Sequence, residues 1–173
     1  PYIYVAGSFE KRKNHLRVME AYAQLPADRP KLVFAGKKST YLQEMLKLAN
    51  KLEIAAEVRV LQNLAFEELP FLYAGAEFTA YLSEFEGFGL PVLESMAVGT
   101  PVLTSNISSM PEVGGNAALY APPTDVEAIA MQMRLLLFDE EGNAAVRKLI
   151  KPQSEQFSAE KMADQLHAFY HAL

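Results

Sequence analysis

The sequence predicts an α/β fold, in which a doubly wound parallel sheet of about six strands carries helices on both faces. Short β-rich runs alternate with amphipathic helical stretches, and no low-complexity segment or internal repeat interrupts them. The chain has 173 residues, half of them hydrophobic, which is enough for one sizeable core. Strand–helix alternation favours parallel strands with right-handed crossovers, so residues 1–173 are expected to form one domain.

Each strand is predicted from a short run rich in aliphatic, β-branched or aromatic residues. These runs are 2–6, 31–35, 57–61, 77–82, 101–104 and 117–120. A parallel sheet of this kind binds ligands beyond the C-terminal ends of its strands. The site is therefore expected in the loops that follow the strands.

Helices are predicted between and after these strands, at 14–25, 39–52, 66–75, 90–98, 124–138, 140–151 and 158–172. In the second of them, Leu42, Met45, Leu46, Ala49 and Leu52 fall on one face at helical spacing. Ser39, then Thr124 or Asp125, and Ser158 are placed to cap helices through their side-chain oxygens. Further core positions are expected at Leu16, Met19, Ala23, Met131, Leu135 and Leu136.

Composition excludes several classes of function. A formal net charge of -5 argues against a general nucleic-acid-binding protein, which normally shows a basic face. The chain has no cysteine, so disulfide and thiolate chemistry are ruled out and a reducing cytosol is compatible. No apolar run is long enough for a bilayer, and no signal-peptide pattern is present. Pro1 is followed at once by a strand-like run, which suggests an excised domain, although removal of an initiator methionine before Pro1 would leave the same start.

The densest functional signal is a glycine-rich turn that carries two acids, Glu86 and Glu94. Residues 83–101 read Ser-Glu-Phe-Glu-Gly-Phe-Gly-Leu-Pro-Val-Leu-Glu-Ser-Met-Ala-Val-Gly-Thr-Pro. Pro91 suits the first helical position, and Gly87 and Gly89 let the backbone approach a ligand closely. Unpaired amides at the positive end of a helix can then bind phosphate. Side chains of a helix lean towards its N-terminus, so Glu94 is expected to reach the same opening as Glu86.

Basic residues are absent from the middle of the chain. No Lys or Arg lies between Arg59 and Arg134, whereas nine acids do: Glu67, Glu68, Glu77, Glu84, Glu86, Glu94, Glu112, Asp125 and Glu127. Compact basic clusters follow the first two strands, at Lys11-Arg12-Lys13 and Lys37-Lys38. A diphosphate would then lie between the cationic first loop and the amides of residues 87–90. The alternative is that residues 11–13 form a solvated loop.

Three ordered segments of this chain resemble one family. Glu-Gly-Phe-Gly-Leu-Pro-Val-Leu-Glu, with Met-Ala-Val-Gly-Thr-Pro-Val-Leu-Thr-Ser after it, is similar to the donor-binding motif of retaining, nucleotide-sugar-dependent glycosyltransferases of group 1, or family 4. The acids have that family's E-x7-E spacing. Residues 7–14 look like its first loop, and residues 110–117 look like its proline-glutamate segment. The resemblance covers nearly the whole chain and implies the Rossmann-like C-terminal half of a GT-B fold.

The resemblance also implies roles for individual residues. Lys13, with Arg12, would bind the donor diphosphate, and Ser83 would lie near the phosphates. The backbone of Gly87, Phe88, Gly89 and Leu90 would contact phosphate and sugar. Glu86 would bind hydroxyls of the transferred sugar and act with Lys13 in catalysis, whereas Glu94 would accept hydrogen bonds from the ribose. Ser8 departs from the pattern, because many members of the family have arginine there.

The implied protein is a two-domain enzyme whose N-terminal acceptor-binding domain is absent from this chain. It would move a sugar from a UDP- or GDP-linked donor to an acceptor hydroxyl, in polysaccharide or glycolipid assembly. The isolated domain would bind its donor weakly and transfer nothing. A cytoplasmic location is expected, with peripheral contact at the inner face of the membrane through the missing domain. Helix 158–172 would lean back across the domain junction, which would account for exposed Phe169 and Tyr170.

Other functions are compatible with parts of this pattern. A nucleotide-sugar epimerase shares the architecture, and a noncatalytic nucleotide-binding module could keep the fold. A glycosidase-like acid and base pair of Glu86 and Glu94 would explain neither the phosphate-binding amides of the glycine-rich turn nor the basic loop at residues 11–13. No separate cofactor is expected, since the nucleotide sugar is the substrate.

No catalytic metal is expected either. The four aspartates, Asp28, Asp125, Asp139 and Asp164, form no Asp-x-Asp pair. His167 and His171 are one helical turn apart and could bind zinc, although a solvated helix is the simpler interpretation. His15 is expected to face solvent. Glu112 either orders the loop at Ser108 and Ser109 or caps a short turn at Pro111.

Overall fold

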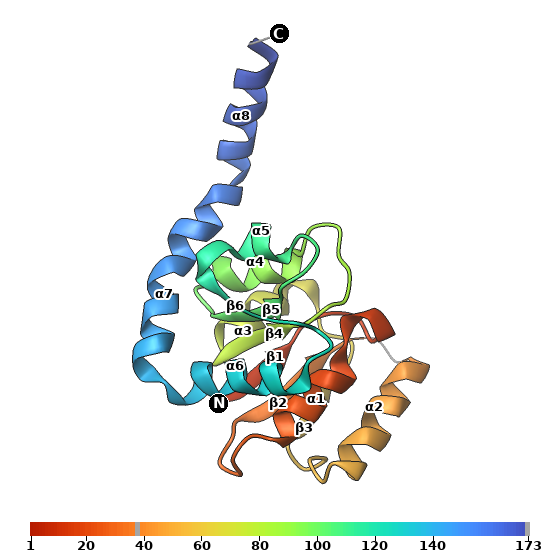
Figure 1. Cartoon of the computed structure of the whole chain (residues 1–173). Coiled ribbons are helices and arrows are strands. Elements are labelled where there is room, and N and C mark those ends of the chain that lie inside the picture. Colours follow the sequence, from red (N-terminus) through yellow and green to blue (C-terminus); the bar gives the residue numbers. More distant parts are fainter. Residues whose placement is uncertain (37–38, 172–173) are drawn as a thin grey trace.

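The computed structural model describes residues 1–36 and 39–171, and its centre is one six-stranded parallel sheet (Figure 1). The strands are β1 (Tyr2–Val5), β2 (Lys31–Ala35), β3 (Val58–Leu61), β4 (Phe78–Tyr81), β5 (Val102–Ser105) and β6 (Ala118–Ala121). Their order is β3-β2-β1-β4-β5-β6, and every neighbouring pair is parallel. The doubly wound sheet predicted from the sequence is confirmed.

Helices cover both faces of the sheet. One face carries α1 (His15–Ala23), α2 (Thr40–Lys51) and α6 (Val126–Phe138); the other carries α3 (Leu69–Ala74), α4 (Leu90–Ala97), α5 (Met110–Gly114) and α7 (Glu140–Ser154). Short 3-10 turns lie at η1 (Lys11–Lys13), η2 (Phe66–Glu68), η3 (Gly115–Ala117) and η4 (Glu155–Phe157). The last helix, α8 (Ala159–His171), extends away from the domain and buries none of its residues (Figure 1).

Alternation along the strands divides the core into two layers. In β1 the side chains of Ile3 and Val5 pack beneath α1 and α6, whereas Tyr4 packs on the opposite face against α3. Successive side chains of a strand point to opposite faces, so burial of both sets explains why the strand sequences are almost continuously apolar.

The predicted helix caps form hydrogen bonds. Ser39 Oγ accepts from Leu42 N at 3.2 Å, Asp125 Oδ1 accepts from Ala128 N at 2.9 Å, and Ser158 Oγ accepts from Lys161 N at 3.1 Å. Asp125 is therefore the cap of α6, which settles the choice between it and Thr124. These bonds satisfy amides of the first helical turn that have no partner within the helix.

Some predicted boundaries and core positions were wrong. The helix predicted at 140–151 continues to Ser154 with Pro152 inside it. Packing outweighs the proline here: Ile150 is buried, and Gln153 Nε2 donates to the carbonyl of Val113 at 3.0 Å. Leu46 and Met131, predicted to be core, are exposed: Leu46 lies at the edge of the buried face of its helix, and Met131 lies on the side opposite the buried residues of α6. Lys37 and Lys38 lie outside the described residues.

The prediction that His15 faces solvent was also wrong. Its side chain is fully buried at the start of α1, among the rings of Phe9, Phe34 and Tyr41. Neither ring nitrogen has a hydrogen-bond partner among the described residues. Burial disfavours the charged imidazolium and lowers the pKa of His15 to about 4.

None of the helices that the structure describes combines the length and the apolar character that a bilayer crossing requires.

The burial of His15 predicts a specific loss of stability in acid. Because the pKa is about 4 in the folded chain and 6.5 as a reference, only the unfolded state takes up the proton between these values. The free energy of unfolding is therefore unaffected by His15 titration above pH 6.5. Below this pH it falls by about 1.4 kcal/mol per pH unit, to a total loss of about 3 kcal/mol near pH 4. Denaturant unfolding at several pH values measures this loss.

The control is His15→Phe, which keeps an aromatic ring in the cluster but cannot titrate. As pH falls from 6.5 to 4, the free energy of unfolding of the unmodified chain should fall relative to that of the variant. A difference that stays constant over this interval would contradict the assignment.

Candidate functional site

The candidate site lies where the order of the sheet reverses, between β1 and β4. The chain leaves β1 and β4 at the same edge of the sheet, so the loops after these two strands meet. They are joined by a backbone hydrogen bond of 2.8 Å, in which Glu84 N donates to the carbonyl of Arg12. The strand order therefore places the basic first loop against the acidic segment that follows β4.

Four of the predicted site residues form one cluster around Glu86. Its Oε1 accepts hydrogen bonds from Lys13 Nζ at 2.5 Å, Arg12 Nη1 at 2.6 Å and Ser83 Oγ at 2.7 Å. No hydrogen bond to Oε2 occurs within the described part of the chain. The carboxylate is thus anchored through one oxygen, and the other can accept from a ligand.

The charges in this cluster are strongly coupled. Desolvation of Glu86 opposes its ionisation, but hydrogen bonds from Lys13 and Ser83 outweigh that effect, and the pKa of Glu86 lies below its ordinary value. Lys13 has only 7% of its surface exposed, although sequence reasoning left a solvated loop open for residues 11–13. That alternative is wrong for Lys13, whereas Lys11 and Arg12 are exposed.

Sequence reasoning missed Tyr81, which contacts the ammonium group of Lys13 with both its hydroxyl and its ring. The Lys13 ammonium donates to the Tyr81 hydroxyl at 2.7 Å and lies 4.9 Å from the centre of its ring. Burial raises the pKa of Tyr81, and the negative charges of Glu86 and Glu94 add to the shift. Its place at the C-terminal end of β4, with a hydroxyl available, was the signal for this role.

The glycine-rich turn leads from Glu86 into α4. Within the described chain, the N–H groups of Gly87, Phe88, Gly89 and Leu90 donate no hydrogen bond. Gly89 has φ of 105°, a conformation that favours glycine, and a Cβ there would lie 2.5 Å from the methyl group of Met110. A Cβ on Gly87 would meet open space. Gly89 is therefore required by the fold, whereas Gly87 leaves the mouth of the turn open.

The helix after this turn begins at the predicted residue, whereas Pro91 takes its second position and not its first. α4 starts at Leu90, so Pro91 is the second helical residue and still needs no amide hydrogen. Leu90 is exposed. The ring of Phe88 is partly exposed and packs edge-on against Phe157, with 5.8 Å between ring centres. These residues border the unpaired amides.

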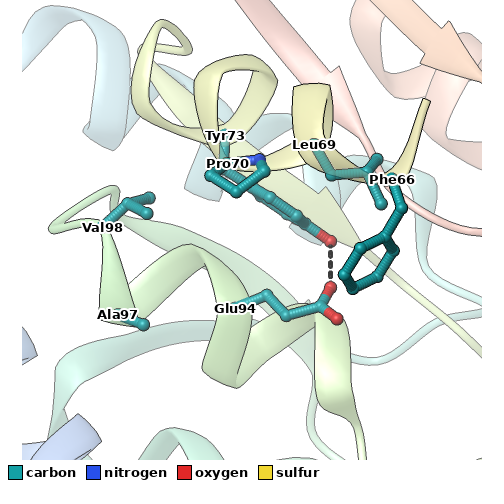
Figure 2. Close-up of a pocket in the computed structure, with 7 residues that line it drawn as sticks. All are labelled: Phe66, Leu69, Pro70, Tyr73, Glu94, Ala97 and Val98. Carbon is teal, nitrogen blue, oxygen red and sulfur yellow. Dashed lines mark hydrogen bonds between the residues drawn. The ribbon is translucent and has the colours of Figure 1, made fainter. Parts of the chain in front are cut away.

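Glu94 lies in a neighbouring pocket with apolar walls (Figure 2). The pocket has a volume of about 200 Å³ and is lined by Phe66, Leu69, Pro70, Tyr73, Glu94, Ala97 and Val98. Tyr73, which sequence reasoning also missed, donates from its hydroxyl to Glu94 Oε2 at 2.7 Å. In Figure 2 the exposed ring of Phe66 lies beside this carboxylate. The pocket offers one oriented acceptor against an apolar floor.

The remaining candidate residues have simpler environments. Ser8, the departure from the usual arginine, donates to Glu10 Oε1 at 2.5 Å, and Glu10 also pairs with Arg12 at 3.0 Å. Glu112 is exposed, and no hydrogen bond of its carboxylate to Ser108 or Ser109 occurs among the described residues.

The part of the chain that the structure describes contains no group of three or more His, Asp or Glu side chains arranged to hold a metal ion. The exposed pair on α8, His167 and His171, has its Nε2 atoms 3.1 Å apart.

Comparisons with known proteins agree with this architecture. Residues 1–153 match the family described as glycosyl transferases group 1. The O-antigen chain mannosyltransferase B of Escherichia coli is 36% identical over 167 residues, which cover 95% of this chain and 44% of that protein. The chain therefore spans less than half the length of this relative.

Solved structures give the same fold. Anabaena HepE in complex with UDP superposes with a TM-score of 0.90 at 19% identity, over 99% of this chain and 49% of that one. The C-terminal domain of a glycosyl transferase group 1 family protein from Francisella tularensis gives a TM-score of 0.80 at 20% identity, over 90% of this chain and 85% of that one.

The Glu86 cluster predicts that an added anion rescues loss of the carboxylate charge. Glu86→Gln leaves Lys13 largely buried without its counter-charge, and we expect a loss of about 1–3 kcal/mol in the free energy of unfolding. Inorganic pyrophosphate should raise the melting temperature of this variant more than that of the unmodified chain. Thermal unfolding with and without pyrophosphate measures both effects.

Glu84→Gln is the matched control, because the ion pair between Glu84 and Arg17 is exposed. It should lose less than about 1 kcal/mol and show no enhanced rescue. If pyrophosphate stabilises all three proteins equally, the cluster is not an anion site.

Proposed function

Because this chain belongs to the glycosyl transferases group 1 family, we propose that it is the donor-binding domain of a retaining glycosyltransferase. The complete enzyme would move a sugar from a nucleoside-diphosphate sugar to an acceptor hydroxyl. The observation that carries this proposal is the cluster of Lys13 and Arg12 around Glu86, beside the unpaired amides that open α4. It combines cations, amide donors and a carboxylate at one edge of the sheet.

The diphosphate of the donor would lie between the first loop and the glycine-rich turn. Lys13 and Arg12 supply positive charge, and the amides of residues 87–90 supply fixed donors at the positive end of α4. When the bond between the anomeric carbon and the distal phosphate oxygen breaks, its electron pair stays on the diphosphate. Donors already in place stabilise that charge without reorganisation, and the loss of one such donor typically raises the barrier by about 3–4 kcal/mol.

Glu86 would contact the transferred sugar. Its Oε1 is held by three protein donors, so Oε2 is the oxygen available to a sugar hydroxyl. The negative charge would also oppose the positive charge that develops on the sugar ring. Because the same carboxylate pairs with both Lys13 and Arg12, an incoming diphosphate has to share these cations with it.

Glu94 would accept hydrogen bonds from the ribose. Tyr73 orients its carboxylate through Oε2, and the apolar walls of the pocket suit the carbon face of a sugar or base. The adjacent pocket formed by Ala35, Gly36, Asn63, Leu64 and Leu69 shares Leu69 with it. The base would lie in this second pocket and be bound by backbone groups near residues 62–64.

We propose mannose as the transferred sugar and polysaccharide assembly as the setting. This rests on relatives named O-antigen chain mannosyltransferase B and serotype-specific mannosyltransferase WbdA, both of Escherichia coli, which are 36% and 33% identical to this chain. Neither assignment requires a separate cofactor or a metal ion.

An N-terminal domain would complete the protein and bind the acceptor. The chain spans 44% of the length of the Escherichia coli relative, which leaves room for such a domain. The unburied helix α8 presents Met162, Leu166, Phe169 and Tyr170 to solvent, all of them large and apolar or aromatic. This face would pack against the missing domain, whose membrane contact would bring the enzyme to its acceptor.

The direct test is thermal unfolding of this chain with GDP, UDP, GDP-mannose and UDP-glucose. A ligand that binds only the folded state stabilises it by RT ln(1 + [L]/Kd), which is about 2.7 kcal/mol at a hundredfold excess of ligand over Kd. At least one nucleotide should raise the melting temperature, and Lys13→Met should abolish the rise. If no nucleotide has an effect, a noncatalytic interaction module becomes the better assignment. Donor incubated with the longer enzyme and no acceptor should yield no epimerised sugar.

The two acids should have separable effects. Glu94→Ala removes the ribose acceptor and should weaken nucleotide binding by about tenfold to a hundredfold, equivalent to about 1.5–3 kcal/mol for a charged hydrogen bond. Glu86→Ala should leave nucleotide binding largely intact and slow transfer by the longer enzyme. Calorimetry measures the first effect, and steady-state kinetics measures the second.

Glu67→Ala is the control for general loss of negative charge, because Glu67 is exposed and directly follows Phe66, which lines the Glu94 pocket. Its nucleotide affinity should match that of the unmodified chain. An equal loss of nucleotide affinity in Glu86→Ala and Glu94→Ala would defeat the division of roles.

A further inference from the structure

Ser108, in the loop after β5, contacts both backbone polar groups of Glu86. Its Oγ donates to the carbonyl oxygen of Glu86 at 2.5 Å and accepts from the amide of the same residue at 3.3 Å. These two residues are 22 positions apart in the sequence. One hydroxyl therefore ties the loop after β5 to the start of the glycine-rich turn.

The same loop reaches the far end of the turn. α5 begins directly after it, and the methyl group of Met110 fills the space where Gly89 lacks a side chain. Ser108 has φ of 58°, in the left-handed region that non-glycine residues seldom adopt. The neighbouring Ser109 makes a single, longer contact with the Glu86 carbonyl, at 3.3 Å. The segment 108–110 thus holds the turn at both of its ends.

Because the peptide bond is planar, the contact of Ser108 with the Glu86 carbonyl also sets the direction of the Gly87 N–H. The carbonyl of Glu86 and the N–H of Gly87 belong to one planar trans peptide, so they point in opposite directions. While Ser108 holds the carbonyl on the side of the β5 loop, the Gly87 amide must face away from that loop. Glycine tolerates rotation of this peptide plane, and a rotated plane would present a carbonyl oxygen in place of the amide.

We propose that Ser108 is a positioning residue that fixes the orientation of the peptide between Glu86 and Gly87. In this orientation the Gly87 N–H can donate a hydrogen bond to the diphosphate of the nucleotide sugar. This role rests on the proposed function. An anion is repelled by a carbonyl oxygen and attracted by an amide hydrogen, so the orientation of this one peptide changes the sign of the local interaction. Ser108 would act on the diphosphate and leave the ribose pocket at Glu94 unaffected.

The test compares Ser108→Gly with Ser109→Ala in this chain. Glycine keeps the left-handed backbone conformation without strain and removes the hydroxymethyl side chain with its hydrogen bonds. Ser109→Ala removes a weaker hydroxyl contact to the same carbonyl. Calorimetry with GDP and UDP, and with guanosine and uridine, separates diphosphate binding from nucleoside binding. Melting temperatures check that both variants fold.

Ser108→Gly should weaken binding of the nucleoside diphosphate about tenfold and leave nucleoside binding unchanged within about twofold. Ser109→Ala should change neither by more than about threefold. The Gly87 amide resonance in a nitrogen–proton correlation spectrum should shift in Ser108→Gly and stay in place in Ser109→Ala.

Two results would overturn the assignment in different ways. If the unmodified chain binds GDP or UDP, and Ser108→Gly either binds it equally well or loses nucleoside affinity to the same degree, Ser108 does not position this amide. If the unmodified chain binds neither nucleotide, the proposed function itself fails and this role falls with it.

Discussion

The pairing of Lys13 with Glu86 is the interaction on which the site depends. A lysine can be buried at the end of a sheet only when its charge is compensated, and here a carboxylate at 2.5 Å and the Tyr81 hydroxyl at 2.7 Å compensate it. The reversal of strand order between β1 and β4 brings these groups together from positions 68 and 73 residues apart. The charge of Lys13 is therefore already compensated within the protein, and a diphosphate gains only the difference between its own attraction and that of Glu86.

The sheet, most helices and the cap residues were predicted from the sequence because they follow from local patterns. A run of apolar residues specifies a buried strand, and a serine or aspartate before a helical stretch specifies a cap, without reference to distant residues. The pairing of Lys13, Arg12 and Ser83 with Glu86 was accessible in outline, since all four follow strands that end at one edge. Direct contact between the cations and the acid itself arises from the tertiary structure, and no local pattern indicates it.

The roles that sequence analysis missed depend on contacts that no local pattern encodes. Tyr73 and Ser108 lie 21 and 22 positions from the acids that they contact, and each belongs to a segment whose own sequence suggests only packing or a turn. His15 was placed in solvent because a histidine at the start of a helix is usually solvated. Three aromatic rings from other segments enclose it, and only tertiary structure brings them there.

The uneven placement of charge along the chain has a consequence for how a ligand arrives. A molecule with a net charge of -5 repels nucleotides at long range, whereas the cations of the first loop attract them only near the site. At physiological ionic strength the Debye length is about 8 Å, so dissolved salt damps the distant repulsion more than the contact attraction. Added salt should therefore weaken the repulsion that slows association, and also the attraction that keeps the nucleotide bound. The association rate and the affinity then respond differently to ionic strength.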